Sequence, residues 1–219
     1  AGTKKHGLAE MENRPFLNQI TRVDPGEKPH FFDLEPLPPK HPDSETAFAT
    51  PFAIQVTADD ATLVGSAAGS DKVFTVDADS GELLGQVPVD AVPRGIALAE
   101  DSGYAWVLNA VSNTVSLIDI ADPTQLKVER TIPLDDPTHA DFKRGRIAFN
   151  TARASSTRSF SCASCHPDGH TDQLLWVLQT PIVSGGNQIM PRSTMPVRGL
   201  RDTEPVSYTH LRAHETIPD

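Results

Sequence analysis

The chain is poor in cysteine, in aromatic residues and in positive charge. Its 219 residues include only two cysteines, two tryptophans and two tyrosines, and 19 lysines and arginines stand against 29 aspartates and glutamates. The net charge of −10 and the lack of a basic patch argue against binding to nucleic acid or to an anionic membrane surface. No run approaches the roughly 18 apolar residues that a membrane-spanning helix needs, so no membrane span is predicted.

The N-terminal part also lacks clear organisation. Its first residues, AGTKKHGLAE, have no apolar signal segment, and the chain begins at Ala1 and not at Met, so we interpret it as a processed product or a fragment. Residues 1–50 are rich in proline and show no sustained period of 2 or 3.6. This pattern predicts a loop-rich lead-in.

Two stretches in the middle of the chain are copies of one unit. Residues 51–77 (PFAIQVTADDATLVGSAAGSDKVFTVD) and 93–119 (PRGIALAEDSGYAWVLNAVSNTVSLID) align without a gap at an offset of 42 residues, from 51 to 93. Each copy holds three short β-type runs separated by turn residues, and a fourth run, ELLGQVPV or LKVERTIPL, follows each copy. Four strands in a period of about 40 to 45 residues are typical of a β-propeller blade. The sequence therefore predicts about two blades over 51–136.

The unit VLNAVSNTVSLIDI also resembles the YVTN-type propeller repeats. A sandwich of two similar antiparallel sheets is the alternative. Because a closed propeller takes about four to eight blades, either the remaining blades lie outside this chain or the two sheets pack in another way.

The character of the sequence changes after the second copy. Thr138 and Asp141 match the spacing of a capping box, and Phe142 and Ile147 follow as an apolar side, so a helix is expected to begin here. We place the boundary near residue 136 and expect a small helical, loop-rich module at 137–205.

Both cysteines of the chain belong to one motif. Cys162 and Cys165 are separated by two residues, and His166 follows directly, which is the CxxCH signature of c-type haem attachment: two thiols bind the haem covalently and the histidine binds its iron. A structural zinc site is one alternative, although it would have to recruit His210 and His214 from far along the chain. A redox dithiol is a second alternative, but such a motif typically follows a strand, and the preceding segment ASSTRSF does not have a strand pattern. A simple disulfide between the two cysteines is the last alternative, but it would leave His166 without a role.

Residues 143–205 resemble the N-terminal haem segment of the bacterial cytochrome c peroxidase and methylamine-utilisation group. The matched parts are the RGRIAF helix, a polar loop, SCASCH, and Asp172 followed by Trp176. The stretch RSTMPVRGLRDTEP at 192–205 resembles the Arg-rich turn of that group, which passes the haem edge. The resemblance implies a small α-helical cytochrome c-like domain at 137–205 with one covalent haem c. Together with the repeat, it predicts a fold of mixed class, in which a mainly β partial propeller precedes this domain.

Two features depart from that group. Its members carry two haems, whereas this chain has one CxxCH, and the expected Trp-Asp-Gly after Pro205 is absent. The tail VSYTHLRAHETIPD is similar to translated sequencing-adapter DNA, so we interpret 206–219 as non-native and the haem module as truncated. His210 and His214 then carry no functional weight.

The iron face opposite His166 holds a second ligand or stays open. Met190 and Met195 lie in a segment that reads as irregular, GGNQIMPRSTMP, and are candidate metal ligands. A methionine ligand would raise the reduction potential and favour electron transfer, while hydrophobic gap-filling is the alternative role. An open site would suit peroxide chemistry. His170 is not expected to be the second ligand, because a residue four positions further along a helix points to the same side as His166 and cannot reach across the ring. It is expected to be solvated or to lie beside a haem propionate.

Charge and size predict the other haem contacts. Arg192, Arg198 and Arg201 are candidates to hold the haem propionates, since a guanidinium pairs well with carboxylates. Trp176 is a candidate wall of the haem crevice. A solvated arginine cluster and ordinary core packing are the alternatives.

Together these observations predict a β-propeller and c-type cytochrome fusion that transfers electrons to or from a redox partner protein or a small-molecule donor or acceptor. The sequence leaves open whether the intact parent is an enzyme with peroxidase-like or oxidase activity. A periplasmic or exported location is expected, because c-type haem is attached outside the bacterial inner membrane. The alternative from another class is a non-catalytic propeller interaction module whose CxxCH binds a structural metal or nothing.

Overall fold

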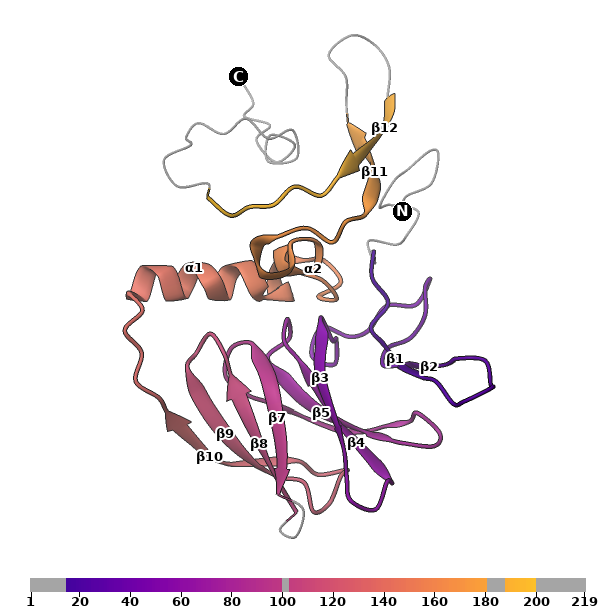
Figure 1. Ribbon diagram of the computed structural model, residues 1–219, viewed down its shortest axis with the longest axis vertical. Helices are drawn as coiled ribbons and strands as arrows, with labels where there is room; N and C mark the ends of the chain where they lie inside the picture. The colour runs from indigo at the N-terminus through magenta and orange to yellow at the C-terminus, as the bar shows by residue number, and fades with distance from the viewer. Residues whose placement is uncertain (1–14, 100–102, 181–187, 200–219) are drawn as a thin grey trace. The chain divides into compact units, whose positions relative to one another are not determined.

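The computed structural model describes residues 15–99, 103–180 and 188–199 (Figure 1). One compact unit spans Phe16–Ser164, and a second contains the described residues from Cys165 onward. We describe each unit by itself. Within these described residues, no helix combines the length and the hydropathy needed to cross a membrane.

The predicted repeat forms two four-stranded antiparallel sheets, each with its strands in chain order. Leu63 lies opposite Val76 in the first sheet, and Ala105 lies opposite Ile118, 42 residues further on, in the second. The two sheets fit a partial propeller, as the sequence predicts. The strands are β3 (Pro51–Val56), β4 (Thr62–Ala67), β5 (Lys72–Asp77), β6 (Leu83–Pro88), β7 (Pro93–Ala99), β8 (Tyr104–Asn109), β9 (Thr114–Asp119) and β10 (Lys127–Pro133).

The turns of the two sheets repeat as well. Asp71 precedes β5 with a φ of 56°, and Asn113 precedes β9 with a φ of 58°. Aspartate and asparagine are the non-glycine residues that adopt this left-handed conformation most readily. The sequence thus places suitable residues at equivalent points of the two hairpins.

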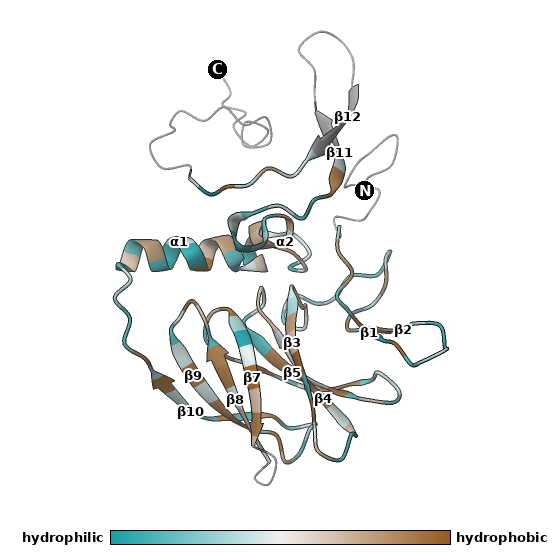
Figure 2. Cartoon of the chain, in the orientation of Figure 1, coloured by the Kyte–Doolittle hydropathy of each residue, from teal (hydrophilic) through white to brown (hydrophobic). Residues whose placement is uncertain are grey.

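The two sheets share one apolar core. Val64 and Val73 of the first sheet pack with Ala105, Val107 and Ile118 of the second, and all five side chains have 0% exposure. Full burial of a valine or isoleucine side chain contributes on the order of 1.5–3 kcal/mol. Figure 2 shows the corresponding apolar colouring of β8 and β9. This interface therefore fixes the second sheet against the first.

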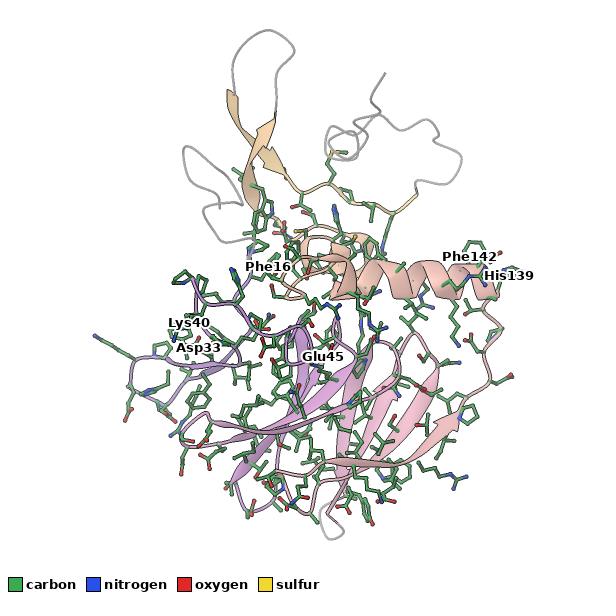
Figure 3. All side chains as sticks on the ribbon, turned by 180° about the vertical axis from the view of Figure 1, so that it is seen from behind. Phe16, Asp33, Lys40, Glu45, His139 and Phe142 are labelled. Carbon is green, nitrogen blue, oxygen red and sulfur yellow. The ribbon has the colours of Figure 1, made fainter. Side chains whose placement is uncertain are left out.

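The N-terminal segment covers the other face of the first sheet. Leu34 and Phe48 of this segment pack with Phe74 and Val76, and the rings of Phe48 and Phe74 meet edge to face with centroids 5.0 Å apart. The segment is mostly irregular, as expected, but it also contains a short hairpin of β1 (Gln19–Arg22) and β2 (His30–Asp33) that the sequence pattern does not predict. Asp33, Lys40 and Glu45 are labelled on this segment in Figure 3.

Helix α1 (Ala140–Asn150) begins close to the predicted place but not with the predicted cap. The N-cap is His139, whose Nδ1 accepts a hydrogen bond from the backbone N–H of Asp141 at 3.3 Å. The capping box that begins at Thr138 is therefore wrong. The sequence rule failed because it ranks hydroxyl and carboxamide side chains as caps and leaves out the imidazole nitrogen that serves here.

Helix α1 is held against the rest of the Phe16–Ser164 unit by one apolar and one charged side chain. Ile147 packs on a small cluster of Ala68, Val92 and Val111, and Lys143 Nζ donates to the carbonyl of Ser112 at 2.7 Å. Phe142 does not belong to this contact face. It is 71% exposed and lies beside His139 at the start of the helix (Figure 3), so the predicted apolar side is only partly correct.

The described part of 137–205 contains little helix. After α1 come a 3-10 turn (Ala152–Ala154), the single turn α2 (Cys162–Cys165), a 3-10 turn (Pro167–Gly169) and a hairpin of β11 (Leu175–Thr180) with β12 (Gln188–Ser193). No substantial cytochrome-like helical domain is evident in these residues. Met190 lies in β12 opposite Leu178, so the expectation of an irregular segment there is wrong.

Phe74→Ala should reduce the free energy of unfolding by about 3–5 kcal/mol, because it leaves a cavity between β5 and Phe48. Phe31→Ala is the matched control, since Phe31 is 60% exposed, and its effect should stay within about 0.5 kcal/mol. Urea unfolding followed by circular dichroism measures both. Equal losses in the two variants would contradict this assignment of the core.

Asp136 should link the anchoring of α1 to pH. A hydrogen bond from Lys143, at 2.9 Å, and one from the backbone of Thr138 lower the pKa of Asp136 from 3.8 to about 2. A lowered pKa in the folded state stabilises the protein above pH 3.8, and this contribution is lost as the pH falls from 3.8 towards about 2.

Asp136→Asn should therefore lower the melting temperature at pH 7, and the difference from the unmodified protein should vanish near pH 2. Asp135→Asn, at an exposed neighbouring carboxylate, should change the melting temperature little at either pH. A pH-independent difference for Asp136→Asn would rule out the linkage.

Candidate functional site

The two cysteines of the CxxCH motif lie on a single helical turn, and His166 follows this turn directly. Positions i and i+3 share one side of a helix, so Cys162 and Cys165 of α2 project from the same side of the turn. Cys162 is exposed and Cys165 is half-buried, and their sulfurs are not bonded to each other, although both lie in the described part of the chain. The turn itself is anchored between them, because Ala163 is buried and the hydroxyl of Ser164 accepts the N–H of Ser161 at 3.0 Å.

The loop that leads into the motif is attached to the N-terminal unit. The backbone N–H of Ala152 donates to the carbonyl of Gly69 at 2.8 Å. Further along, the carbonyl of the buried Ser159 accepts a hydrogen bond from Asn18 Nδ2 at 3.3 Å. Both contacts join residues that are far apart in the sequence, so the polar stretch before the motif has a defined path.

The imidazole of His166 is oriented by a backbone carbonyl. Its Nδ1 lies 2.7 Å from the carbonyl oxygen of Met195. A carbonyl oxygen only accepts, so Nδ1 is the donor, and in the neutral form of the ring Nε2 then carries the lone pair. This is the arrangement in which a histidine binds a metal through Nε2, with the second ring nitrogen held in place by a hydrogen bond.

The chain does not continue as a helix after His166. Asp168 and Gly169 have φ values of 51° and 79°, and His170 also lies outside helical geometry. The premise that placed His170 along the same helical side as His166 is therefore wrong, because left-handed residues turn the chain after the motif. His170 is nevertheless exposed, as expected.

The segment 194–198 crosses the turn that follows the motif. The N–H of Val197 donates to the carbonyl of Gly169 at 2.8 Å, and Arg198 Nε donates to the carbonyl of Asp168 at 2.9 Å. A Cβ atom at Gly169 would lie only 3.1 Å from Cγ of Arg198, so the close crossing favours glycine at this point. Together with the contact at Met195, these bonds tie the two segments into one small structure.

Asp172 is the polar centre of this structure. Its carboxylate accepts the N–H of Leu174 and the indole N–H of Trp176, both at 2.9 Å. Burial alone would raise the pKa of Asp172, but hydrogen bonds from Thr194, Leu174 and Trp176 outweigh burial and lower it below 3.8. Its own N–H donates to the carbonyl of Cys165 at 3.1 Å, so Asp172 connects the motif with the hairpin.

The structure brings some of the predicted site residues together and leaves others undescribed. Met195 and Arg198 contact the motif and its turn, Met195 through its backbone and Arg198 through its side chain. Trp176 is buried, with 7% exposure. The side chains of Met190 and Arg192, and all of Arg201, His210 and His214, lie outside the described residues.

Sequence reasoning missed the supporting roles of Asp172 and Thr194. The spacing of Asp172 and Trp176 is visible in the sequence, but nothing there shows that the carboxylate and the indole are bonded. The Met195 carbonyl leaves no sequence signal, because every residue has one.

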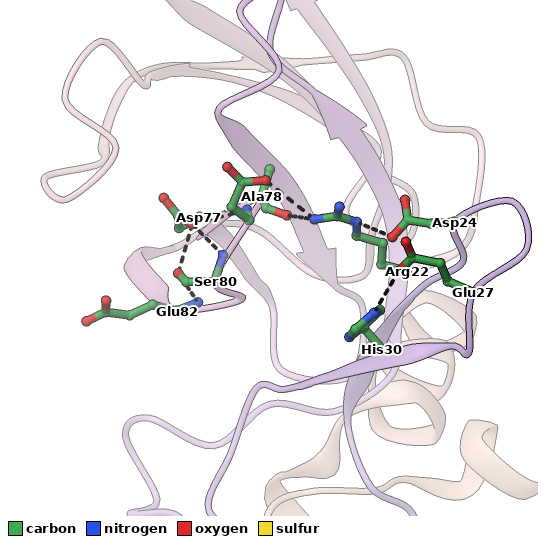
Figure 4. Close-up of polar contacts among 9 residues, drawn as sticks. Arg22, Asp24, Glu27, His30, Asp77, Ala78, Ser80 and Glu82 are labelled. Atoms are coloured by element: carbon green, nitrogen blue, oxygen red, sulfur yellow. Dashed lines mark hydrogen bonds and ion pairs between the residues drawn. The ribbon is translucent and has the colours of Figure 1, made fainter.

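A second cluster of charged side chains lies on the β1–β2 hairpin. One oxygen or nitrogen each from Asp24, Glu27 and His30 lie within 4.8 Å of one another (Figure 4). The cluster is accounted for by ion pairing, since Arg22 Nε donates to Asp24 at 2.9 Å and Arg22 Nη1 donates to the carbonyl of Ala78 at 3.3 Å. These contacts fasten the hairpin to the first sheet.

Comparison with known proteins finds similarity to parts of solved structures. No protein-family profile matches the chain, and a search of the curated proteins finds no match. Hydrazine synthase from Kuenenia stuttgartiensis is 29% identical over 46% of this chain and 27% of its own, with a TM-score of 0.37. Dihydro-heme d1 dehydrogenase NirN, in complex with DHE, is 18% identical over 41% of this chain and 18% of its own, with a TM-score of 0.35. The β-propeller domain of Myceliophteria thermophila Cps50 (Swd1) is 16% identical over 54% and 41%, with a TM-score of 0.43.

Asp172→Asn should loosen the structure around the motif. The substitution removes the charge that strengthens the bonds from Leu174 and Trp176, at an expected cost of about 1–2 kcal/mol in the half-exposed setting. The pKa of Asp172 is lowered, so the same contribution in the unmodified protein should be present above pH 3.8 and lost as the pH falls below it.

Trp106→Phe leaves Trp176 as the sole tryptophan, since the chain has two, and its emission provides the measurement. In that background Asp172→Asn should shift the emission to longer wavelength and lower its unfolding midpoint. Asp60→Asn, in an exposed left-handed turn that asparagine tolerates, should do neither. An unchanged emission in the Asp172 variant would contradict the role assigned to the carboxylate.

Proposed function

We propose that this chain binds one haem c covalently and transfers electrons. The observation that carries the proposal is the pair of cysteines on one helical turn, followed directly by His166. The Nδ1 atom of His166 is held by the carbonyl of Met195, 2.7 Å away. The two thiols, the ring nitrogen Nε2 and their spacing fit the donor set of a c-type haem. A zinc site would need two further ligands.

The chain's own residues have distinct tasks in this proposal. Cys162 and Cys165 would hold the haem covalently, each through one thioether bond. His166 offers its Nε2 lone pair to iron, and the Met195 carbonyl fixes the ring and raises its basicity through Nδ1. The bound haem supplies an iron that gains or loses one electron.

The contact at Met195 also bears on the second iron ligand. Its carbonyl lies at the Nδ1 edge of the His166 ring, the edge away from Nε2. Because its backbone is already bonded to the ring that would bind iron, Met195 is proposed as a support for His166. Met190 is the better candidate for a sulfur ligand, and an open position is the other choice.

The remaining haem contacts are proposed from charge and burial. Arg198 uses Nε for the Asp168 carbonyl, and its outer guanidinium nitrogens are suited to a propionate. Arg192 and Arg201 are proposed for the same task, and the buried Trp176 for a wall of the haem site.

We propose a periplasmic or exported location, because covalent haem attachment takes place there. The partner is a redox protein or a small-molecule electron donor or acceptor. Peroxidase-like or oxidase activity is proposed only for a longer parent, since two-electron chemistry commonly needs a second redox centre beyond a one-electron haem.

The test is expression of the full chain in the periplasm together with the cytochrome c maturation proteins. A denaturing gel stained for haem should show a coloured band for the unmodified chain and none for the variant with both Cys162→Ala and Cys165→Ala. His170→Ala is the matched control, because this exposed histidine lies four residues beyond His166. It should keep both the band and the visible spectrum of the reduced protein.

Two results would overturn the proposal. One is a colourless unmodified chain that contains one zinc ion per molecule, which would favour the interaction-module alternative. The other is haem that washes out on denaturation although both cysteines are present.

A further inference from the structure

The outer face of the second sheet is apolar and open among the described residues. Trp106 and Leu108 of β8 are each 40% exposed. Val115 lies opposite Leu108 and Leu117 opposite Trp106 on β9, and both are half-buried. Large apolar side chains that cluster on one sheet face in this way mark an interaction surface.

The internal repeat shows what such a face contacts. At the offset of 42 residues, the exposed Trp106 corresponds to Val64 and the half-buried Val115 to Val73. Val64 and Val73 have 0% exposure, because the second sheet covers them with Ala105, Val107 and Ile118. The same face of the unit is therefore buried in its first copy and open in its second.

The open face is also better suited to apolar contact than its buried counterpart. Ser66 and Thr75 of the first sheet correspond to Leu108 and Leu117 of the second. In the first sheet the hydroxyl of Thr75 donates to the carbonyl of Pro123 at 2.5 Å, so part of that interface is polar. Leucine at the equivalent position replaces this polar contact with apolar surface.

The face of the first sheet that points away from the second sheet is already covered. Leu34 and Phe48 of the N-terminal segment pack on the far face of the first sheet, around Phe74 and Val76. That segment occupies the place that a preceding sheet would take. Among the described residues, the β7–β10 side is the one left open to a further sheet.

We propose that the outer face of β7–β10 is a docking surface for a further four-stranded blade. Its occupant is an antiparallel sheet with small aliphatic side chains on the contacting face, equivalent to Ala105, Val107 and Ile118. The contact continues the interface that joins the first two sheets. This inference does not depend on haem binding.

The experiment builds the occupant into the full chain. A second copy of residues 93–134 is inserted directly after Leu134, in a Trp176→Phe background and with Trp106→Phe in the inserted copy. The original Trp106 is then the only tryptophan. Docking should shift its emission to shorter wavelength and reduce its quenching by iodide severalfold, compared with the Trp176→Phe chain without the insertion.

The matched control carries Val107→Glu in the inserted copy alone, which places a carboxylate on the contacting face. It should restore the emission and the quenching of the chain without the insertion. Persistence of the blue shift in this control would overturn the proposal, because the face that carries Val107 would not then be the contact.

Three further outcomes of these experiments would also overturn the docking proposal. An inserted copy that folds, as judged by added β signal in circular dichroism, while Trp106 stays exposed would overturn the proposal. An inserted copy that stays unfolded would do the same, because a single blade cannot bury its apolar faces alone and needs the docking surface to order it. A dimer of the unmodified chain that Leu108→Glu dissociates would assign the face to a second copy instead.

Discussion

The face-to-face packing of two equivalent sheets is the constraint on which the N-terminal unit depends. Val64 and Val73 meet Val107 and Ile118 with no exposed surface. Since a lone four-stranded sheet with two apolar faces would leave both of them in water, neither copy of the unit is complete without a neighbour. Helix α1 follows from this arrangement, because its Ile147 packs on a cluster contributed by both sheets.

The CxxCH segment is held by a different kind of interaction. Backbone carbonyls at Met195, Gly169 and Asp168 each take part in one hydrogen bond, and Asp172 adds two through its carboxylate. Trp176 provides buried apolar surface there. Regions with few buried contacts open at lower free energy than a packed core. Under the proposed function this is an advantage, because the thiols would have to be accessible while haem is attached.

Sequence alone predicts the strands well because their evidence is local. Period-2 alternation, turn residues such as Asp71 and Asn113, and the internal repeat all point to the same two sheets. The start of α1 was misassigned by one residue, since an imidazole can replace the hydroxyl of Thr138 as a cap. The expected helical domain around the motif came from a resemblance and not from periodicity. The described residues form single turns and a hairpin instead.

The candidate site also combines features that are local in the sequence with features that depend on residues far apart in it. The proposed haem attachment depends on the identity and spacing of Cys162, Cys165 and His166, and these can be read from five letters of the sequence. The tautomer of His166 depends on a carbonyl 29 residues away, and any residue at position 195 would supply that oxygen. Side-chain identity therefore predicts which groups can react, whereas the path of the backbone decides which atom of each group is presented. For His166 that atom is Nε2, and only the folded chain shows it.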